Sequence, residues 1–502
     1  MSPQAQILLG QADQPVQLLG RYANRHGLIA GATGTGKTVS LLVLAEGFSR
    51  LGVPVFMADV KGDVAGLALA GEDSERLRQR AVRTGLGHYQ PEGNPVLLWD
   101  LAGQAGHPLR TTLSELGPLL LGRVLELSDS QQGVLDIAFR LADDEGLLLL
   151  DLADLRALLH QLAERRKEIS VQYGLVSPQS IGAIQRALLR LEGEGGAAFF
   201  AEPALELTDL LRTDLTGRGC ISILAADKLI LQPRLYGSFL LWLLSELFEN
   251  LPEVGDQELP RLVFFFDEAH LLFADAKPLL RQRIEQVVRL IRSKGVGIYF
   301  CSQYPDDLPA EILGQLGNRI QHALRAYTPR DQKAVRTAAQ TFVANPGVDV
   351  AGLIGQLAVG EALVSCLQDG GVPQPVQRTL ICPPRCRLGA LTAAERAAVQ
   401  GRSPLAGKYD QTINRESAYE ILSRDLEARS AVGPPPAPSR PSSPGGAGEQ
   451  DRGMLGELLW GNGRRQGVAE TLAKQTVRTI GSQLGRQIVR GLLGGIFGGG
   501  RR

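Results

Sequence analysis

Short apolar runs alternate with longer helical stretches along much of this chain. Several of the runs are continuously apolar, which is typical of strands in a parallel sheet that is buried on both faces. The repeated order of strand, loop and helix predicts an α/β fold with right-handed crossovers. The runs that we interpret as strands are 26–30, 53–58, 95–99, 219–224, 261–266, 297–302, 319–324 and 360–367.

The alternation stops between residues 108 and 215, where leucine recurs at helical spacing in stretches such as "TTLSELGPLLLGRVLEL". We interpret this region as an all-helical insertion within the sheet domain, with the leucine stripes as core positions. Further on, a stretch rich in Pro, Ser and Gly predicts a flexible linker. The predicted parts are the first part of the sheet domain at 1–107, the insertion at 108–215, the second part of the sheet domain at 216–390, a helical extension at 391–429, the linker at 430–453 and a tail at 454–502.

The tail has the pattern of a basic amphipathic helix, because cations recur every four residues and aliphatic residues fall on the opposite arc. Three roles stay open for it: packing on its own or a neighbouring subunit, peripheral contact with an anionic membrane surface, and contact with the DNA backbone. The basic residues are Arg464, Arg465, Lys474, Arg478, Arg486, Arg490, Arg501 and Arg502, with Glu470 as the one acid among them.

Bulk composition indicates the cellular location of the protein more than it indicates the function. The 502-residue chain has 53 basic and 53 acidic residues, so any nucleic-acid surface must be a local patch rather than a bulk charge. Five scattered cysteines and the lack of a basic segment followed by a long apolar core at the start of the chain predict a cytoplasmic protein without a signal peptide. The longest apolar run, 235–248, is shorter than a membrane span and carries Glu246.

The sequence "GATGTGKT" at 31–38 stands between a predicted strand and a predicted helix, and it fits the phosphate-loop pattern G-x4-G-K-[ST]. Its glycines let backbone N–H groups surround a phosphate, and the helix N-terminus adds its positive end. We expect Lys37 to reach the β- and γ-phosphates and Thr38 to supply a hydroxyl ligand to Mg²⁺. The predicted nucleotide-binding residues are Gly31, Ala32, Thr33, Gly34, Thr35, Gly36, Lys37, Thr38 and Val39.

An acidic pair ends the predicted strand in "RLVFFFDEAHLL". We predict that Asp267 holds the Mg²⁺ shell and that Glu268 polarises the attacking water. The letters DEAH also occur in helicases with two motor domains, but only one sheet domain is predicted here. We therefore interpret His270 as incidental or as a local hydrogen-bonding residue. Because no N-K-x-D guanine-reading motif stands out, we expect ATP rather than GTP.

Two further polar groups follow predicted strands. Gln303 in "GIYFCSQYPDDLP" could sense the γ-phosphate or position water, or it could be an ordinary polar strand end. Asp59, Lys61 and Asp63 in "VFMADVKGDVAGL" lie where open α/β sheets face their ligands. This charged cluster could couple the nucleotide state to DNA or to a neighbouring subunit, or it could be a solvated turn.

Together the motifs "GATGTGKT", "DVKGD", "LVFFFDEAH" and "GIYFCSQYPDDLP", followed by "LGNRIQHAL", resemble the HerA/FtsK branch of P-loop motor ATPases. The phrases "RHGLIAGATGTGKTVS", "QLGNRIQHALRAYTPRDQKAV" and "SPLAGKYDQTINRESAYEIL" are most similar to the YjgR-like bacterial proteins with a HerA-like helicase C-terminal domain. This closer likeness spans most of the chain. The resemblance implies a RecA-like P-loop NTPase core that hydrolyses ATP with Mg²⁺.

Members of that branch are hexameric DNA translocases and their relatives, so the resemblance implies a homo-oligomer, a hexamer included. HerA carries a β-barrel ahead of its motor domain for assembly and for docking a nuclease. Only thirty residues precede the phosphate loop here, so we do not expect that barrel or that nuclease partner. Ring members also place an arginine against the neighbour's γ-phosphate. We favour Arg292 for this role over the other candidates, which are Arg289, Arg319, Arg325 and Arg330.

The function that these residues predict is a Mg²⁺-dependent ATPase motor acting on DNA. Two alternatives stay open from the sequence. One is an ATP-switched assembly or signalling protein that does not translocate, and the other is a motor that works on a protein substrate.

Overall fold

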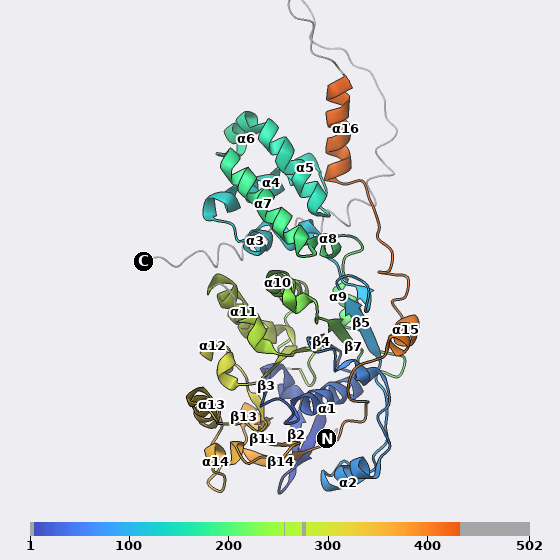
Figure 1. The fold of residues 1–502 in the computed structure, drawn as a ribbon, viewed down its shortest axis with the longest axis vertical. Helices are drawn as coiled ribbons and strands as arrows, with labels where there is room; N and C mark the ends of the chain where they lie inside the picture. Colours follow the sequence, from blue (N-terminus) through green and yellow to red (C-terminus); the bar gives the residue numbers. More distant parts are fainter. Residues whose placement is uncertain (1–4, 256, 274–277, 432–502) are drawn as a thin grey trace, which may run out of the picture. The chain divides into compact units, whose positions relative to one another are not determined.

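The computed structural model describes residues 5–255, 257–273 and 278–431 (Figure 1). Within the described ranges, residues 5–424 belong to one compact unit, and residues 425–431, the end of the helix α16 (Ala418–Ala431), belong to a second. The predicted linker, apart from its first two residues at the end of α16, and the predicted basic tail lie outside the described residues. No helix in the described ranges is both long and apolar enough to cross a membrane.

Within the described ranges, a twelve-stranded sheet has the order β2-β1-β14-β11-β10-β3-β9-β8-β4-β7-β5-β6. In chain order its strands are β1 (Gln6–Gln11), β2 (Pro15–Leu19), β3 (Gly27–Ala30), β4 (Val55–Asp59), β5 (Val96–Asp100), β6 (His107–Pro108), β7 (Ile221–Ala225), β8 (Leu262–Phe266), β9 (Val296–Ser302), β10 (Asn318–Gln321), β11 (Glu361–Ser365) and β14 (Gln377–Ile381). The short β12 (Leu367–Gln368) and β13 (Val372–Pro373) pair with each other.

The strands from β10 to β6 pair in parallel, whereas β11, β14, β1 and β2 add an antiparallel edge. The parallel part explains the continuously apolar runs, because both faces of these strands are covered. In β8, for example, Phe264 and Phe266 belong to one hydrophobic core while Val263 and Phe265 belong to the other. Each predicted strand is present, and the predicted α/β class with a RecA-like, mainly parallel core is confirmed.

Helices cover both faces of the sheet (Figure 1). The core that contains Phe265 also contains Leu42 and Phe48 of the helix that follows the phosphate loop. The core on the other face joins the sheet to α10 and to the helices of the insertion. The helices that the site and the fold depend on most are α1 (Lys37–Arg50), α2 (Glu75–Arg83), α10 (Pro233–Asn250), α11 (Pro278–Ile291), α12 (Ala310–Leu313), α13 (Pro329–Gln340), α14 (Val350–Ile354) and α15 (Ala393–Gly401).

Between β6 and β7 the chain forms the helical insertion that the leucine pattern predicts. Several of its helices begin at a polar residue that accepts hydrogen bonds from the first turn, as Thr112, Asp151 and Ser177 do. The helices are α3 (Leu113–Val124), α4 (Asp129–Glu145), α5 (Leu152–Glu164), α6 (Arg166–Tyr173), α7 (Pro178–Gly193), α8 (Gly196–Phe199) and α9 (Leu207–Leu210).

Residues 403–420, which we call the strap, connect the edge of the sheet to the insertion. His107 of β6 contacts Asp410 of the strap through its Nδ1 atom, at 2.9 Å. At the other end, the backbone N–H of Tyr419 donates to the Asp154 carboxylate in α5, at 2.8 Å. The strap therefore fastens β6 to α5 through a segment that lies more than 250 residues further along the chain.

His26 is a fully buried imidazole at the turn into β3. Its Nδ1 accepts from the backbone N–H of Ile298 at 3.0 Å, so its Nε2 carries the proton that is donated to the Val288 carbonyl, at 2.9 Å. Burial, together with the charge of Arg292, lowers the pKa of His26 from 6.5 to about 4, although the bond to Val288 opposes the shift. The neutral ring is therefore built into the fold.

We expect this histidine to make the protein less stable in mild acid. The unfolded chain binds a proton below about pH 6.5 and the folded chain only below about 4, so the free energy of unfolding falls as the pH drops through that window. Between pH 7.5 and 5 the loss from this one group is about 2 kcal/mol. Urea unfolding at both pH values should show a loss smaller by that amount in His26→Gln. The same change at exposed His160 is the control, and an equal loss in both variants would contradict the prediction.

Candidate nucleotide-binding site

The phosphate loop has a backbone that only glycine adopts easily. It leaves β3 at Ala30 and enters α1 at Lys37, and Gly34 and Gly36 have φ angles of 78° and 117°. Lys37 folds back over the loop, where its ammonium donates to the carbonyl of Gly31 at 2.6 Å. Burial, followed by the nearby charge of Lys61, lowers the pKa of Lys37. A phosphate at the loop would compete with the carbonyl for this cation.

His322 at the end of β10 supports the loop from behind. Its Nδ1 lies 2.9 Å from the carbonyl of Glu361, and its Nε2 lies 2.8 Å from the Ser40 hydroxyl in α1. Burial lowers the pKa of His322 to about 4, so the ring is neutral at pH 7. Because a carbonyl can only accept, Nδ1 carries the proton and Nε2 accepts from Ser40. Beside it, the N–H of Gly360 donates to the carbonyl of Thr35, at 3.0 Å.

Sequence reasoning did not single out this support, although His322 lies in the quoted "LGNRIQHAL". A side chain on Gly31 would come within 2.5 Å of the Cβ atom of His322. The first glycine of the loop is therefore required by the close approach of β10 as well as by its own φ angle of 151°.

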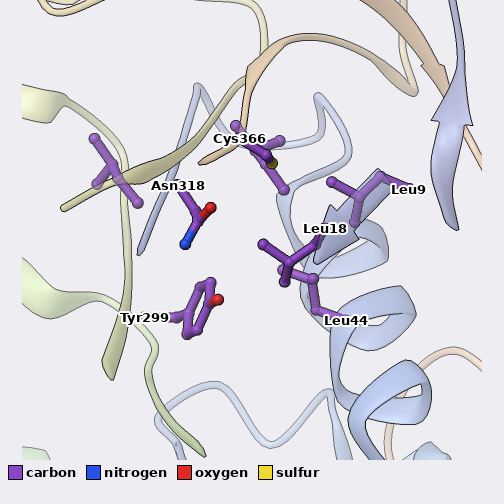
Figure 2. A pocket seen from close by; sticks show the side chains of 8 residues that line it. Leu9, Leu18, Leu44, Tyr299, Asn318 and Cys366 are labelled. Carbon is purple, nitrogen blue, oxygen red and sulfur yellow. The ribbon is translucent and has the colours of Figure 1, made fainter. Parts of the chain in front are cut away.

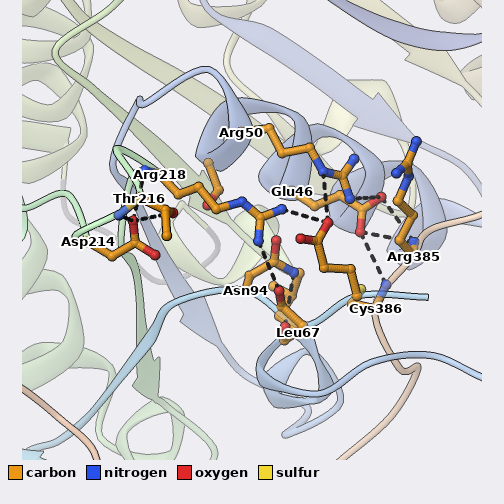
Figure 3. A network of polar contacts seen from close by, with 12 residues as sticks. Glu46, Arg50, Leu67, Asn94, Asp214, Thr216, Arg218, Arg385 and Cys386 are labelled. Atoms are coloured by element: carbon orange, nitrogen blue, oxygen red, sulfur yellow. Dashed lines mark hydrogen bonds and ion pairs between the residues drawn. The ribbon is translucent and has the colours of Figure 1, made fainter. Parts of the chain in front are cut away.

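The far side of α1 is held by a network of charges, which Figure 3 shows. Glu46 is 3% exposed, and its carboxylate accepts from the backbone N–H groups of Arg385 and Cys386 at 3.0 to 3.2 Å. Arg50 lies 3.7 Å from Glu46 and 3.6 Å from Glu92. These contacts attach α1 to the segment that carries Arg385 and Cys386, and so help to hold the helix that follows the phosphate loop.

The acidic pair leaves the end of β8, as predicted. Burial is the largest influence on Asp267 and raises its pKa to about 6, with the charge of Glu268 acting in the same direction and that of Lys61 against it. Glu268 is 5% exposed and has a φ angle of 48°, which is uncommon for a residue with a side chain. One oxygen of its carboxylate forms an ion pair with Lys61, and the other lies 3.3 Å from Nδ1 of His270.

The loop after β4 brings Lys61 to the acidic pair. The Asp59 carboxylate accepts from the backbone N–H groups of Gly62, Asp63 and Val64 at 2.7 to 3.3 Å and so shapes this loop. Burial raises the pKa of Asp59 to about 6. The predicted charged cluster thus has different parts: Asp59 turns inward to the loop, and Lys61 reaches Glu268.

Gln303 follows β9, which lies between the strand of the phosphate loop and the strand of the acidic pair. The register pairs Ala30 of β3 with Ser302 and Phe266 of β8 with Phe300, so the three strands end close together. The carbonyl of Ser302 accepts from the first N–H of the loop, at 3.3 Å. Half-buried Gln303 therefore stands at the same edge of the sheet as the phosphate loop and the acidic pair.

The candidate arginines have different surroundings. Arg319 donates from its guanidinium to the carbonyls of Leu316, Thr341 and Leu313 at 2.7 to 3.0 Å, which indicates a structural role. Arg292 is half-buried directly after α11, near His26, and Arg289 is exposed on that helix. Arg325 is exposed, and the side chain of Arg330 lies outside the described residues.

The oxygen atoms of Thr38 and Asp267 are of the kind that Mg²⁺ prefers. In the described ranges, no group of three or more His, Cys, Asp or Glu side chains could hold a metal ion by itself. In nucleotide sites Mg²⁺ takes one or two protein ligands and completes its shell with phosphate and water. A small pocket elsewhere, shown in Figure 2, is apolar and is lined by none of the predicted nucleotide-binding residues.

A family model described as "Helicase HerA-like C-terminal" matches residues 4–502. A probable helicase of Methanocaldococcus jannaschii is 23% identical over 363 residues, which cover 71% of this chain and 63% of the relative. Another probable helicase of that organism is 32% identical over 133 residues, or 26% of this chain and 24% of the relative. The chain thus spans less than two thirds of the length of either relative.

Among solved structures, the plasmid coupling protein TrwB in complex with ADP and Mg²⁺ matches with a TM-score of 0.50 and 16% sequence identity. The match covers 76% of this chain and 90% of that one. At this identity the likeness establishes a shared fold.

Proposed function

Because the chain belongs to the HerA-like helicase C-terminal family of P-loop ATPases, we propose that it hydrolyses ATP with Mg²⁺ and works as an oligomeric motor on DNA. The observation that carries the proposal is the convergence of three strand ends: the phosphate loop after β3, Gln303 after β9 and the acidic pair after β8. The names of the matched relatives, two probable helicases, support DNA as the substrate.

In the proposed reaction, Lys37 and the backbone N–H groups of the loop bind the β- and γ-phosphates. Glu268 accepts a proton as water attacks the γ-phosphorus, the bond to the bridging oxygen breaks, and ADP and inorganic phosphate leave. Gln303 orients that water. Mg²⁺, held by Thr38 and Asp267, would neutralise charge on the phosphates.

Arg292 of a neighbouring subunit is proposed to complete the site. An arginine in that place stabilises the charge that develops on the transferred phosphoryl group, and it typically raises the rate by a factor of about 10³–10⁵. This part of the proposal requires an oligomer, with a hexameric ring as the arrangement we favour. Arg292→Ala in the full chain should then lower turnover while leaving the ATP affinity of each subunit nearly unchanged.

The deciding experiment measures ATP turnover with and without double-stranded DNA, alongside the mass of the protein in solution. We expect DNA to stimulate turnover several-fold at low salt, and the stimulation to fade as salt rises because phosphate contacts release counterions. GTP in place of ATP tests the choice of base. Turnover that ignores DNA at low salt, in a protein that is folded and active, would contradict a DNA motor and favour an ATP-switched assembly protein or a motor on a protein substrate.

A further inference from the structure

The carboxylate that should activate water already has a cation beside it. Lys61 forms an ion pair with one oxygen of Glu268, and His270 lies beside the other at 3.3 Å. The ammonium of Lys61 therefore covers one of the two oxygens through which this buried carboxylate could accept a proton from water. A carboxylate held in this way is a weaker proton acceptor than a free one.

The backbone of Lys61 is held in place, whereas its side chain has room to move away from Glu268. Its backbone is fixed by the loop that Asp59 organises, next to the strand that ends in the acidic pair. Its side chain, in contrast, is 38% exposed.

Lys37 and Lys61 have different partners in this arrangement. Lys37 faces the phosphate loop, where a bound triphosphate would meet it, whereas Lys61 is paired with the buried carboxylate of Glu268 at the end of β8. When that ion pair opens, Glu268 is released and its lone pairs become available to water.

We propose that Lys61 is a positioning residue that competes with the attacking water for Glu268, and that hydrolysis requires this ion pair to open. The inference rests on the proposed ATPase function. It adds a restraint on hydrolysis, by which we mean the ion pair between Lys61 and Glu268. The restraint links the loop after β4 to the acidic pair after β8. A partner that displaced the loop after β4 would change the rate of ATP hydrolysis without contacting the nucleotide.

Lys61→Met tests the restraint, because methionine keeps the length of the side chain and removes its charge. At pH 8 and saturating Mg²⁺-ATP without DNA, we expect kcat to rise about fivefold, the change that corresponds to roughly 1 kcal/mol for a partly exposed ion pair. KM should stay within about twofold, because the phosphates keep Lys37. Lys61→Arg should restore the slow basal rate. Lys333→Met, at an exposed position on α13, is the matched control.

A second measurement does not depend on catalysis. Removing Lys61 strands a buried carboxylate, so Lys61→Met should melt at a lower temperature than the wild type. In a Glu268→Gln background, Lys61→Met should lower the melting temperature by less, because no carboxylate is left for Lys61 to pair with. The double variant should also hydrolyse no faster than Glu268→Gln alone.

The outcomes are distinguishable. Unchanged or reduced kcat in Lys61→Met, beside an active wild type, overturns this inference and leaves the ATPase proposal standing. A large rise in KM would make Lys61 a phosphate ligand and would also overturn it, as would additive melting shifts in the double variant. If the wild type hydrolyses no ATP, the proposed function fails and the restraint with it.

Discussion

A Glu268→Gln variant is expected to bind ATP nearly as tightly as the wild type and to hydrolyse it at least about a hundredfold more slowly, since general-base catalysis contributes about 10²–10⁴. Glutamine keeps the shape of the side chain but cannot take a proton from water at neutral pH. The contacts expected for the phosphates, namely the loop N–H groups and Lys37, do not involve this residue. Binding and turnover should therefore separate.

The measurement is a pair of titrations on the same preparation: a fluorescent ATP analogue for affinity and phosphate release for turnover. Glu311→Gln, an exposed change of the same chemistry on α12, should match the wild type in both. Turnover of Glu268→Gln within about twofold of the wild type would remove Glu268 from its proposed role.

Lys37→Ala is expected to weaken the binding of ATP, the step that precedes hydrolysis. Losing a buried cation from a charged contact costs about 2–5 kcal/mol, so the dissociation constant for ATP should rise at least about 30-fold and turnover should be lost. The ammonium also donates to the carbonyls of Gly31 and Ala32, so its loss should loosen the loop. A melting curve without nucleotide checks that the fold itself persists.

Lys333→Ala on α13 controls for the loss of a lysine in general. The contrast between the two site variants is the stronger test: Lys37→Ala should lose binding, while Glu268→Gln should keep it. Equal ATP affinity in Lys37→Ala and the wild type would place the nucleotide somewhere other than the phosphate loop.

The central sheet could be predicted from the sequence because each of its strands is covered on both faces. A run such as Leu262–Phe266 is apolar without alternation, and this signal is local. The antiparallel edge of β1, β2 and β14 was missed. Its strands are less uniformly buried, and β1 pairs with β14 across more than 350 residues of chain, a pairing that no local pattern records.

The candidate site also has residues that could be named from the sequence and contacts that could not. The phosphate loop and the acidic pair are contiguous motifs, so their residues could be named in advance, and their roles stay predictions. The contacts of Lys61 with Glu268 and of His322 with Ser40 join residues that are distant in the chain. Lys61 was singled out only as part of a charged turn, because nothing in "DVKGD" states which carboxylate its ammonium meets.

The strap has a mechanical consequence for the insertion. The insertion enters and leaves the sheet domain through two covalent connections, after β6 and before β7, and it also shares a hydrophobic core with the sheet. The contacts of His107 with Asp410 and of Tyr419 with Asp154 add a third attachment, made through a separate piece of chain. While these contacts are made, the strap opposes a rotation of the insertion about its two covalent connections. The strap is therefore a set of contacts through which the edge of the sheet and the insertion hold one another in a single orientation.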